Sequence, residues 1–222
     1  MKNLRKIALS LAVCMLITML SACVLTQKDY TPTDENFFTF TEVEGGYAIS
    51  KKEGETLPSD VVIPKKYNGK NVVQIADKGF YLSEIETLKI PETVKHIGSV
   101  AFSSCPNLKR VTILEGGLES IGDYTFYSCS KLSDVELPES LVSIGKSAFQ
   151  STAIGDIDLR KNVETVGASA FRGCENLASV YIGMNVSYIG ENAFDGCNSS
   201  IKFFISESSP YFELVEGVPV KK

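Results

Sequence analysis

Hydrophobic residues recur along most of the chain with a spacing of about 23 residues. Phenylalanine marks six copies of the pattern, separated by 22, 24, 23, 22 and 23 residues: Phe80, Phe102, Phe126, Phe149, Phe171 and Phe194. Five residues before each phenylalanine stands an isoleucine or a valine, and a glycine follows it in five of the six copies. A unit of this length cannot bury its own apolar face, whereas stacked copies form a continuous core. The pattern predicts a repeat solenoid with the phenylalanines in an internal ladder.

Each copy also contains a short alternation of apolar and other residues, which predicts a strand. The apolar pairs are Leu88/Ile90, Val111/Ile113, Val135/Leu137, Ile157/Leu159, Val180/Ile182 and Ile201/Phe203. Because successive residues of a strand point to opposite faces, each pair is expected to point inward and its neighbours outward. Stacking then predicts a parallel β-sheet on one face of the coil, with short turns or helical turns on the other. The repeat glycines are expected to supply a left-handed turn or a close backbone approach.

The first 22 residues have the features of an export signal. Basic residues precede an apolar stretch at 7–20, which is shorter than the about 20 residues that a membrane-spanning helix needs. The sequence Leu20-Ser21-Ala22-Cys23 that follows resembles the lipobox of bacterial lipoproteins. By that resemblance Cys23 becomes the first residue of the mature protein and carries lipid, and residues 23–36 form a tether. An ordinary signal peptide that is cleaved nearby is the alternative.

Two segments flank the predicted repeats and are expected to cap them, because a solenoid exposes its end coils. Within residues 37–50, Gly45-Gly46 separates two alternating apolar runs and predicts a hairpin. We therefore assign residues 37–71 to an N-terminal cap with its lead-in segment, 72–202 to six repeats and 203–222 to a C-terminal cap.

The repeat pattern over about residues 72 to 205 resembles the BspA-like, Treponema-type leucine-rich repeats of bacterial surface proteins. Its consensus here is L-x-x-V-x-L-P-x-x-L-x-x-I-G-x-x-A-F-x-x-C. The resemblance implies a right-handed leucine-rich-repeat coil. It also implies a place on the surface of a bacterium, with adhesion to host matrix or to other bacteria as one form of binding.

Charge and composition exclude several classes of function. The net charge of −5 becomes −8 once residues 1–22 are removed, because 19 Lys and Arg then remain against 27 Asp and Glu. This balance repels phosphate backbones, so no nucleic-acid partner is expected. The single histidine, His96, allows no Ser-His-Asp or Cys-His catalytic arrangement, and no phosphate-binding glycine loop is present. No catalytic residue, cofactor or metal site is assigned.

Four cysteines remain after the signal segment and Cys23 are set aside. They occupy one position of the repeat, three residues after the phenylalanine: Cys105, Cys129, Cys174 and Cys197. The pattern favours free thiols that act as small core residues. Bridges between neighbouring coils, joining 105 to 129 and 174 to 197, are the alternative. A metal site is disfavoured because no Cys-x-x-Cys pair or nearby histidine accompanies them.

The outward face of the predicted sheet is the candidate binding surface. Its residues are Lys89, Arg110, Thr112, Asp134, Glu136, Asp156, Asp158, Tyr181 and Lys202. Four of these, Asp134, Glu136, Asp156 and Asp158, would form a two-by-two acidic patch on adjacent strands. Such a patch could bind Ca²⁺ or a cationic ligand, although a hydrated acidic surface is the favoured interpretation.

Together these features predict a non-catalytic lipoprotein on the outer side of a bacterial membrane. It would bind a protein or a glycan through its sheet face, as a monomer that is attached to the membrane only by the lipid on Cys23. A scaffold for another envelope protein is the alternative. An enzyme that acts on glycans through a carboxylate pair comes last.

Overall fold

The computed structural model describes residues 30–159 and 162–222. Residues Thr33–Lys222 form one compact unit, which contains the coils of the solenoid and both of its caps. The predicted signal segment and Cys23 lie outside the described residues. Within the described ranges, no helix has the length and apolar character needed to cross a membrane.

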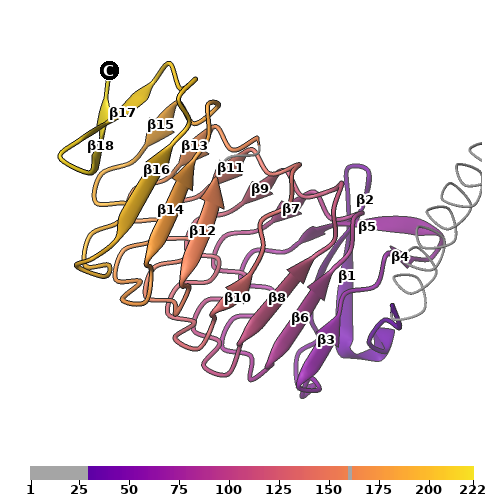
Figure 1. The fold of residues 1–222 in the computed structure, drawn as a ribbon. Coiled ribbons are helices and arrows are strands. Elements are labelled where there is room, and N and C mark those ends of the chain that lie inside the picture. The colour runs from indigo at the N-terminus through magenta and orange to yellow at the C-terminus, as the bar shows by residue number, and fades with distance from the viewer. Residues whose placement is uncertain (1–29, 160–161) are drawn as a thin grey trace, which may run out of the picture. The chain divides into compact units, whose positions relative to one another are not determined.

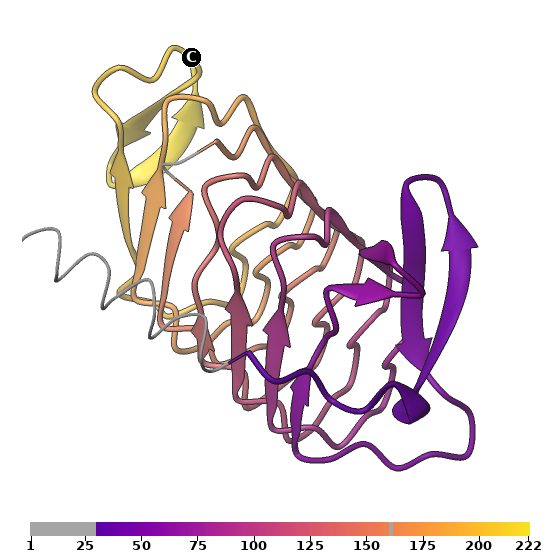
Figure 2. The same ribbon diagram turned by 90° about the vertical axis from the view of Figure 1, so that its right-hand side faces the viewer.

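Each coil of the solenoid has three sides, which are seen in Figure 2. One coil illustrates them. It runs through β6 (Thr87–Ile90) on what we call the strand side and through β7 (His96–Ile97) on the bridge side. Residues 99–104 then form turns, on the turn side, before β8 (Arg110–Ile113) begins the next coil. The architecture confirms the predicted repeat solenoid.

The strand side contains two parallel sheets where the sequence predicted one (Figure 1). The first sheet has the order β10-β8-β6-β3, and the second has the order β12-β14-β16. The remaining strands of the two sheets are β3 (Asp60–Val62), β10 (Asp134–Val135), β12 (Asp156–Leu159), β14 (Ser179–Ile182) and β16 (Lys202–Ile205). Strand β3 belongs to the segment before the first predicted repeat, so the stack begins one strand earlier than the phenylalanine pattern indicates.

The register of β16 differs from the predicted one by two residues. Phe203 lies opposite Val180 and Ile205 opposite Ile182, so the inward pair is Phe203/Ile205. The predicted pair Ile201/Phe203 is therefore two residues out of register, although both side chains pack against the core. Phe204, between Phe203 and Ile205, points outward opposite Tyr181, and 45% of it is exposed.

The bridge side carries a second stack of short parallel strands, which the sequence did not predict. Its order is β1-β2-β5-β7-β9-β11-β13-β15, with β4 (Lys66–Tyr67) paired to β5. Beyond the cap strands its members are β5 (Lys70–Ile75), β9 (Ser120–Ile121), β11 (Ser143–Ile144), β13 (Thr165–Val166) and β15 (Tyr188–Ile189). In each of these strands the isoleucine or valine of the repeat is the last residue, and it faces the core.

The repeat glycines permit close packing of neighbouring coils. A Cβ at Gly145 would lie 2.5 Å from the carbonyl carbon of Gly122, and one at Gly190 would lie 2.3 Å from the amide nitrogen of Ala168. Neither glycine has the positive φ of a left-handed turn. The expected close backbone approach is confirmed, and the left-handed turn at these glycines is wrong.

The turn side is held by hydrogen bonds between coils, and its described residues contain no helical turn. In one coil the N–H groups of Tyr124, Phe126 and Ser128 donate to carbonyl oxygens of the next coil at 2.8, 2.7 and 2.9 Å. The residues two before and two after the phenylalanine have left-handed φ, 56° at Tyr124 and 57° at Ser128. Left-handed residues on both sides of the phenylalanine interrupt a right-handed helix. The predicted short turns therefore form, and the predicted helical turns do not.

The core is a stack of phenylalanine rings that runs the length of the repeats. Successive rings from Phe80 to Phe194 have centroids 5.1–5.6 Å apart and planes within 20° of parallel. Phe38 of the N-terminal cap covers the first ring edge to face, with its centroid 6.1 Å from that of Phe80 and the planes 68° apart. Phe194 ends the stack of parallel rings and is only partly buried; the ring of Phe203 meets it edge to face, with the centroids 5.2 Å apart.

The two ends of the solenoid are covered differently. Strands β1 (Phe38–Val43) and β2 (Gly46–Lys51) form a hairpin, and β2 pairs with β5, so this cap is hydrogen-bonded to the coils. Strands β17 (Phe212–Val215) and β18 (Val218–Lys221) form a separate two-stranded sheet. This second hairpin contributes the buried side chain of Phe212 to the core.

Candidate functional site

The outward surface of the strand side holds all nine residues that the sequence assigned to ligand binding. The register places Arg110 between Thr87 and Asp134, in one row across β6, β8 and β10. Lys89 and Thr112 are neighbours in the next row. Arg110 and Thr112 are exposed, because their strand neighbours Val111 and Ile113 point into the core.

Arg110 and Asp134 form an ion pair between neighbouring coils. The Nε of Arg110 lies 2.5 Å from Oδ2 of Asp134, and 61% and 57% of the two side chains are exposed. An exposed pair contributes little to stability, about 0–1 kcal/mol. These charges are therefore available to a ligand at small structural cost.

A hollow of about 470 Å³ adjoins this ion pair. Its polar lining consists of Arg110, Thr112, Glu115, Asp134 and Glu136. Strand β10 ends at Val135, and no other strand of the described ranges pairs with its far side, so the hollow lies where the first sheet stops. The side chains offer one cation, one hydroxyl and three carboxylates for polar contacts with a ligand.

The second sheet presents a more apolar surface. Tyr181 stacks on Phe204, with ring centroids 4.8 Å apart and planes 13° from parallel. Lys202 lies exposed at the start of β16, in the row that also contains Asp156. Phe204 was missed by the sequence analysis. A strict spacing of 23 residues from Val180 and Ile182 would have placed Phe203 and Ile205 inward and Phe204 outward.

The predicted two-by-two acidic patch does not form. Asp134 and Glu136 belong to the end of the first sheet, whereas Asp156 and Asp158 belong to the second, and β10 does not pair with β12. Asp134 faces Arg110, and Asp156 accepts a hydrogen bond from the Ser179 hydroxyl. Four carboxylates facing one another at strand spacing would repel, and the gap between the sheets avoids that arrangement. Across the described ranges, no cluster of three or more His, Cys, Asp or Glu side chains could hold a metal ion.

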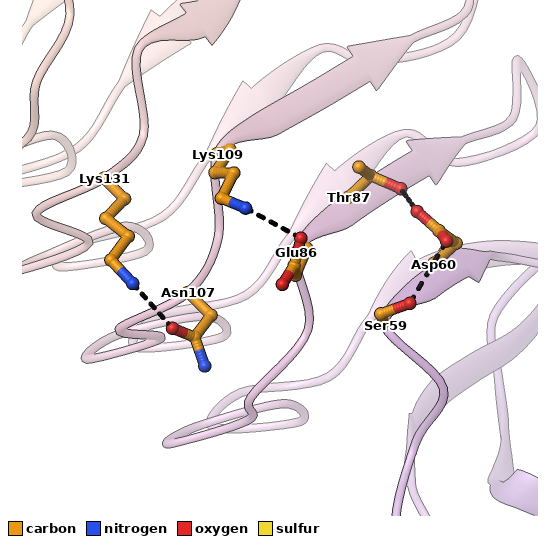
Figure 3. A network of polar contacts seen from close by, with 7 residues as sticks. All are labelled: Ser59, Asp60, Glu86, Thr87, Asn107, Lys109 and Lys131. Atoms are coloured by element: carbon orange, nitrogen blue, oxygen red, sulfur yellow. Dashed lines mark hydrogen bonds and ion pairs between the residues drawn. The ribbon is translucent and has the colours of Figure 1, made fainter.

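A separate line of polar contacts follows the corner where the strands of the first sheet begin (Figure 3). The Nζ of Lys109 donates to Oε2 of Glu86 at 2.8 Å, and the Nζ of Lys131 donates to Oδ1 of Asn107 at 2.8 Å. The Thr87 hydroxyl donates to Asp60 at 2.5 Å. Each of these contacts joins one coil to the next, so these side chains serve the stack.

The four repeat cysteines are free and pack along the core. Each thiol donates to the carbonyl oxygen of the phenylalanine in the preceding coil, as Cys129 does to Phe102 at 3.0 Å and Cys197 to Phe171 at 3.1 Å. The interaction of the protonated thiol with the cysteine of the preceding coil, together with burial, raises the pKa of Cys129 and of Cys197. Both thiols are therefore poor nucleophiles.

The histidine lies on the bridge side, away from the strand side. His96 is exposed, and its Nδ1 is 2.8 Å from the hydroxyl of Ser120 in the next coil. Among the contacts of the described residues, His96 has none with a cysteine or a carboxylate that could form a catalytic group with it.

Comparison with known proteins identifies the repeats. The family model for the BspA type leucine-rich repeat region matches residues 70–209, with six copies of the repeat. A leucine-rich repeat protein of Treponema pallidum is 31% identical, with a TM-score of 0.72 over 78% of this chain and 81% of that one. No curated protein matches the chain.

Two further crystal structures share the fold. A leucine-rich cell surface protein of Faecalibacterium prausnitzii is 23% identical, with a TM-score of 0.64 over 86% of this chain and 58% of that one. The pneumococcal vaccine antigen PcpA is 21% identical, with a TM-score of 0.58 over 87% of this chain and 54% of that one. The three-sided coil, the six repeat copies and the Treponema pallidum structure together show that the chain belongs to the family of BspA-type leucine-rich repeat proteins.

Proposed function

We propose that this protein is a non-catalytic lipoprotein of the bacterial surface, which binds a protein or a glycan through the outward surface of its strand side. Its family supports this role, because leucine-rich repeat solenoids present extended surfaces to macromolecules. The name of the Faecalibacterium prausnitzii relative, a cell surface protein, supports the location. Adhesion is the form of binding that we propose.

The observation that carries the proposal is the outward aromatic pair on the second sheet. Tyr181 and Phe204 stack on each other, and 45% of Phe204 is exposed. Exposed aromatic residues surrounded by polar ones are typical of binding hot spots. Here Asp158 lies beside Tyr181 in the same row and Lys202 lies in the neighbouring row, and the polar hollow at Arg110 and Asp134 belongs to the same side.

Replacing both Tyr181 and Phe204 with serine is expected to abolish binding through the strand side. The mature protein would be immobilised and exposed to matrix proteins, to whole bacterial cells and to detergent-solubilised membranes of the producing bacterium. We expect the double variant to retain at least tenfold less of the bound partner, because aromatic hot spots contribute about 2 kcal/mol or more each. The retained material would be measured by quantitative mass spectrometry.

The matched control is Tyr188→Ser, which removes an aromatic side chain of similar exposure, 52%, from the bridge side. Equal retention by the double variant and the wild type would contradict the proposed surface. Retention of a single membrane protein, with none of matrix or cells, would instead support the scaffold role.

Replacing Cys23 with alanine is expected to release the protein from the membrane. The lipobox places the lipid on this residue, and a soluble solenoid has no other attachment in the proposal. The measurement is the share of protein in the membrane fraction against the medium, together with incorporation of radiolabelled palmitate. Cys14→Ala, within the apolar stretch of the signal, is the control and should remain membrane-bound and labelled. Palmitate labelling that persists in Cys23→Ala would refute the anchor.

A further inference from the structure

A second hollow opens on the turn side of the first three coils. Its volume is about 350 Å³, and it is lined by Lys78, Tyr81, Val100, Ser103, Ser104, Tyr124 and Tyr127. The repeat explains its shape. The position after the phenylalanine holds Tyr81, Ser103 and Tyr127 in successive coils, so a small side chain lies between two large ones. Tyr81 and Tyr127 are two coils apart, about 10 Å at the usual strand spacing.

The residues around this hollow occupy backbone positions that suit other residue types better. Val100 and Tyr124 have left-handed φ values of 61° and 56°. The equivalent positions of later coils hold Ser147, Ser169 and Asn192. A β-branched residue such as valine is disfavoured in the left-handed region, where asparagine is tolerated far better. Leu82, with φ of 58°, takes another left-handed position beside Tyr81, where later coils have serine or glycine.

Bulky residues at such positions cost stability, and strained residues of this kind cluster at functional sites. Here Val100 and Tyr124 both line the hollow. The later coils satisfy the same turns with small polar residues, so the fold itself does not require Val100 or Tyr124. A ligand that uses these side chains would explain their presence.

The chemistry of the lining indicates the kind of ligand. Tyr81 is 47% exposed, and Tyr124 and Tyr127 meet edge to face with centroids 5.8 Å apart. Ser103 and Ser104 add hydroxyl groups at the floor, and Lys78 adds a cation. Lys146 brings a second ammonium, with its Nζ 5.8 Å from the Tyr124 ring centroid.

Among the described residues, none that lines the hollow carries a carboxylate. The carboxylates of Asp77 and Asp123, next to Lys78 and Tyr124 in the chain, accept hydrogen bonds from backbone N–H groups of the following coils at 2.7 Å each. The charge that the hollow offers to a ligand is therefore positive.

The backbone on this side is already paired. The N–H groups of Val100, Phe102 and Ser104 donate to carbonyl oxygens of the next coil at 2.8, 2.9 and 2.7 Å. A partner peptide could thus add no main-chain ladder here, in contrast to the edge of a sheet. The lining favours a ligand that is recognised by its rings, hydroxyls and charge.

We propose that this hollow binds an acidic saccharide, a sugar that carries a carboxylate. Tyrosine rings would pack against the C–H faces of the sugar, since aromatic rings offer large rigid apolar surfaces with a polar group at one end. The hydroxyls of Ser104 and the tyrosines would bond to the sugar hydroxyls. Lys78 would pair with the carboxylate through a charge-assisted hydrogen bond. This site lies on a different side of the coil from the surface proposed for adhesion, so either one can fail alone.

The test is calorimetric titration of the mature chain with 3′-sialyllactose, with digalacturonic acid and with neutral lactose. We expect one of the two acidic sugars to bind more tightly than lactose. Tyr81→Ala and Tyr127→Ala should each weaken that binding at least tenfold, and Lys78→Ala should remove the preference for the acidic sugar. Gln150→Ala, at the same repeat position one coil beyond the hollow, should bind as the wild type does.

Several results would overturn the proposal. They are the absence of binding to both acidic sugars, equal binding of lactose, and undiminished binding by Tyr127→Ala. The variant with Tyr181 and Phe204 both changed to serine should bind the sugar normally. Loss of sugar binding in that variant would transfer the site to the strand side and also overturn the proposal.

A second measurement tests the cost of the backbone conformation without any ligand. Val100→Asn should raise the melting temperature by about 2–4 °C, because asparagine adopts the left-handed conformation more readily, and should weaken sugar binding. Ser169→Asn, at the equivalent turn of a later coil, should leave sugar binding unchanged. A melting temperature of Val100→Asn at or below that of the wild type would contradict the strain on which the proposal relies.

Discussion

Replacing Phe126 with alanine is expected to lower the free energy of unfolding by about 3–5 kcal/mol. The ring is fully buried in the middle of the stack, with its centroid 5.5 Å from that of Phe102 and 5.3 Å from that of Phe149. The neighbouring rings cannot close the cavity, because hydrogen bonds between coils hold the spacing on all three sides. Urea unfolding followed by circular dichroism would measure the loss.

Phe194→Ala is the matched control at the open end of the stack. Phe194 has only one ladder neighbour among the described residues, Phe171, and is partly exposed, so its truncation should cost clearly less. Equal losses for the two variants would show that the stack does not act as a continuous core. A loss below about 1 kcal/mol for Phe126→Ala would contradict the role of the ladder altogether.

Replacing Gly145 with alanine is expected to destabilise the protein by about 3 kcal/mol, at the upper end for overpacked sites. Its Cβ would lie 2.5 Å from the carbonyl carbon of Gly122 and 2.6 Å from the amide nitrogen of Asp123, both in the preceding coil. Backbone atoms cannot rotate away as a flexible side chain can, so the two coils would have to separate and weaken their hydrogen bonds. The loss would be measured by the same urea unfolding.

Gly155→Ala provides the control for this substitution. A Cβ at Gly155 would meet no described atom within 4 Å, and this glycine does not have a left-handed φ. The replacement should be neutral or slightly stabilising, since alanine restricts the unfolded chain. Similar stabilities of the two variants would mean that close approach at the repeat glycines is not needed for stacking.

The repeat, its core and the solenoid class could be predicted because each depends on a spacing that is local in the sequence. Phenylalanine at a period of 22 to 24 residues, with isoleucine or valine five residues earlier, returns to the same side of every coil whatever the details of the turns. The same argument placed the cysteines in the core, where Cys105, Cys129 and Cys174 have no exposed surface.

The strand register at the C-terminal end illustrates why spacing alone was insufficient for the binding surface. The run from Ile201 to Ile205 has three apolar residues in one alternating set, Ile201, Phe203 and Ile205, so its pattern allows two registers for the inward pair. Pairing with Val180 and Ile182 selects Phe203 and Ile205, and this register places Phe204 rather than Lys202 opposite Tyr181.

The hollow on the turn side was also beyond the reach of the sequence pattern. Tyr81, Ser103 and Tyr127 are 22 and 24 residues apart, and nothing in the chain between them marks a site. Stacking brings them together, and Val100 and Tyr124, which have left-handed φ, complete the lining.

The sequence by itself determined that this protein is a stack of coils with a phenylalanine core, because burial of a periodic apolar set is possible in few other ways. Only the tertiary structure decided that the strand side breaks into two sheets between β10 and β12, which separates the four acidic residues into two groups. It also decided which side chains meet on the surface. Contacts between coils depend on the register of residues more than 20 positions apart, and that register is set by the balance of packing, backbone pairing and charge repulsion over the whole stack.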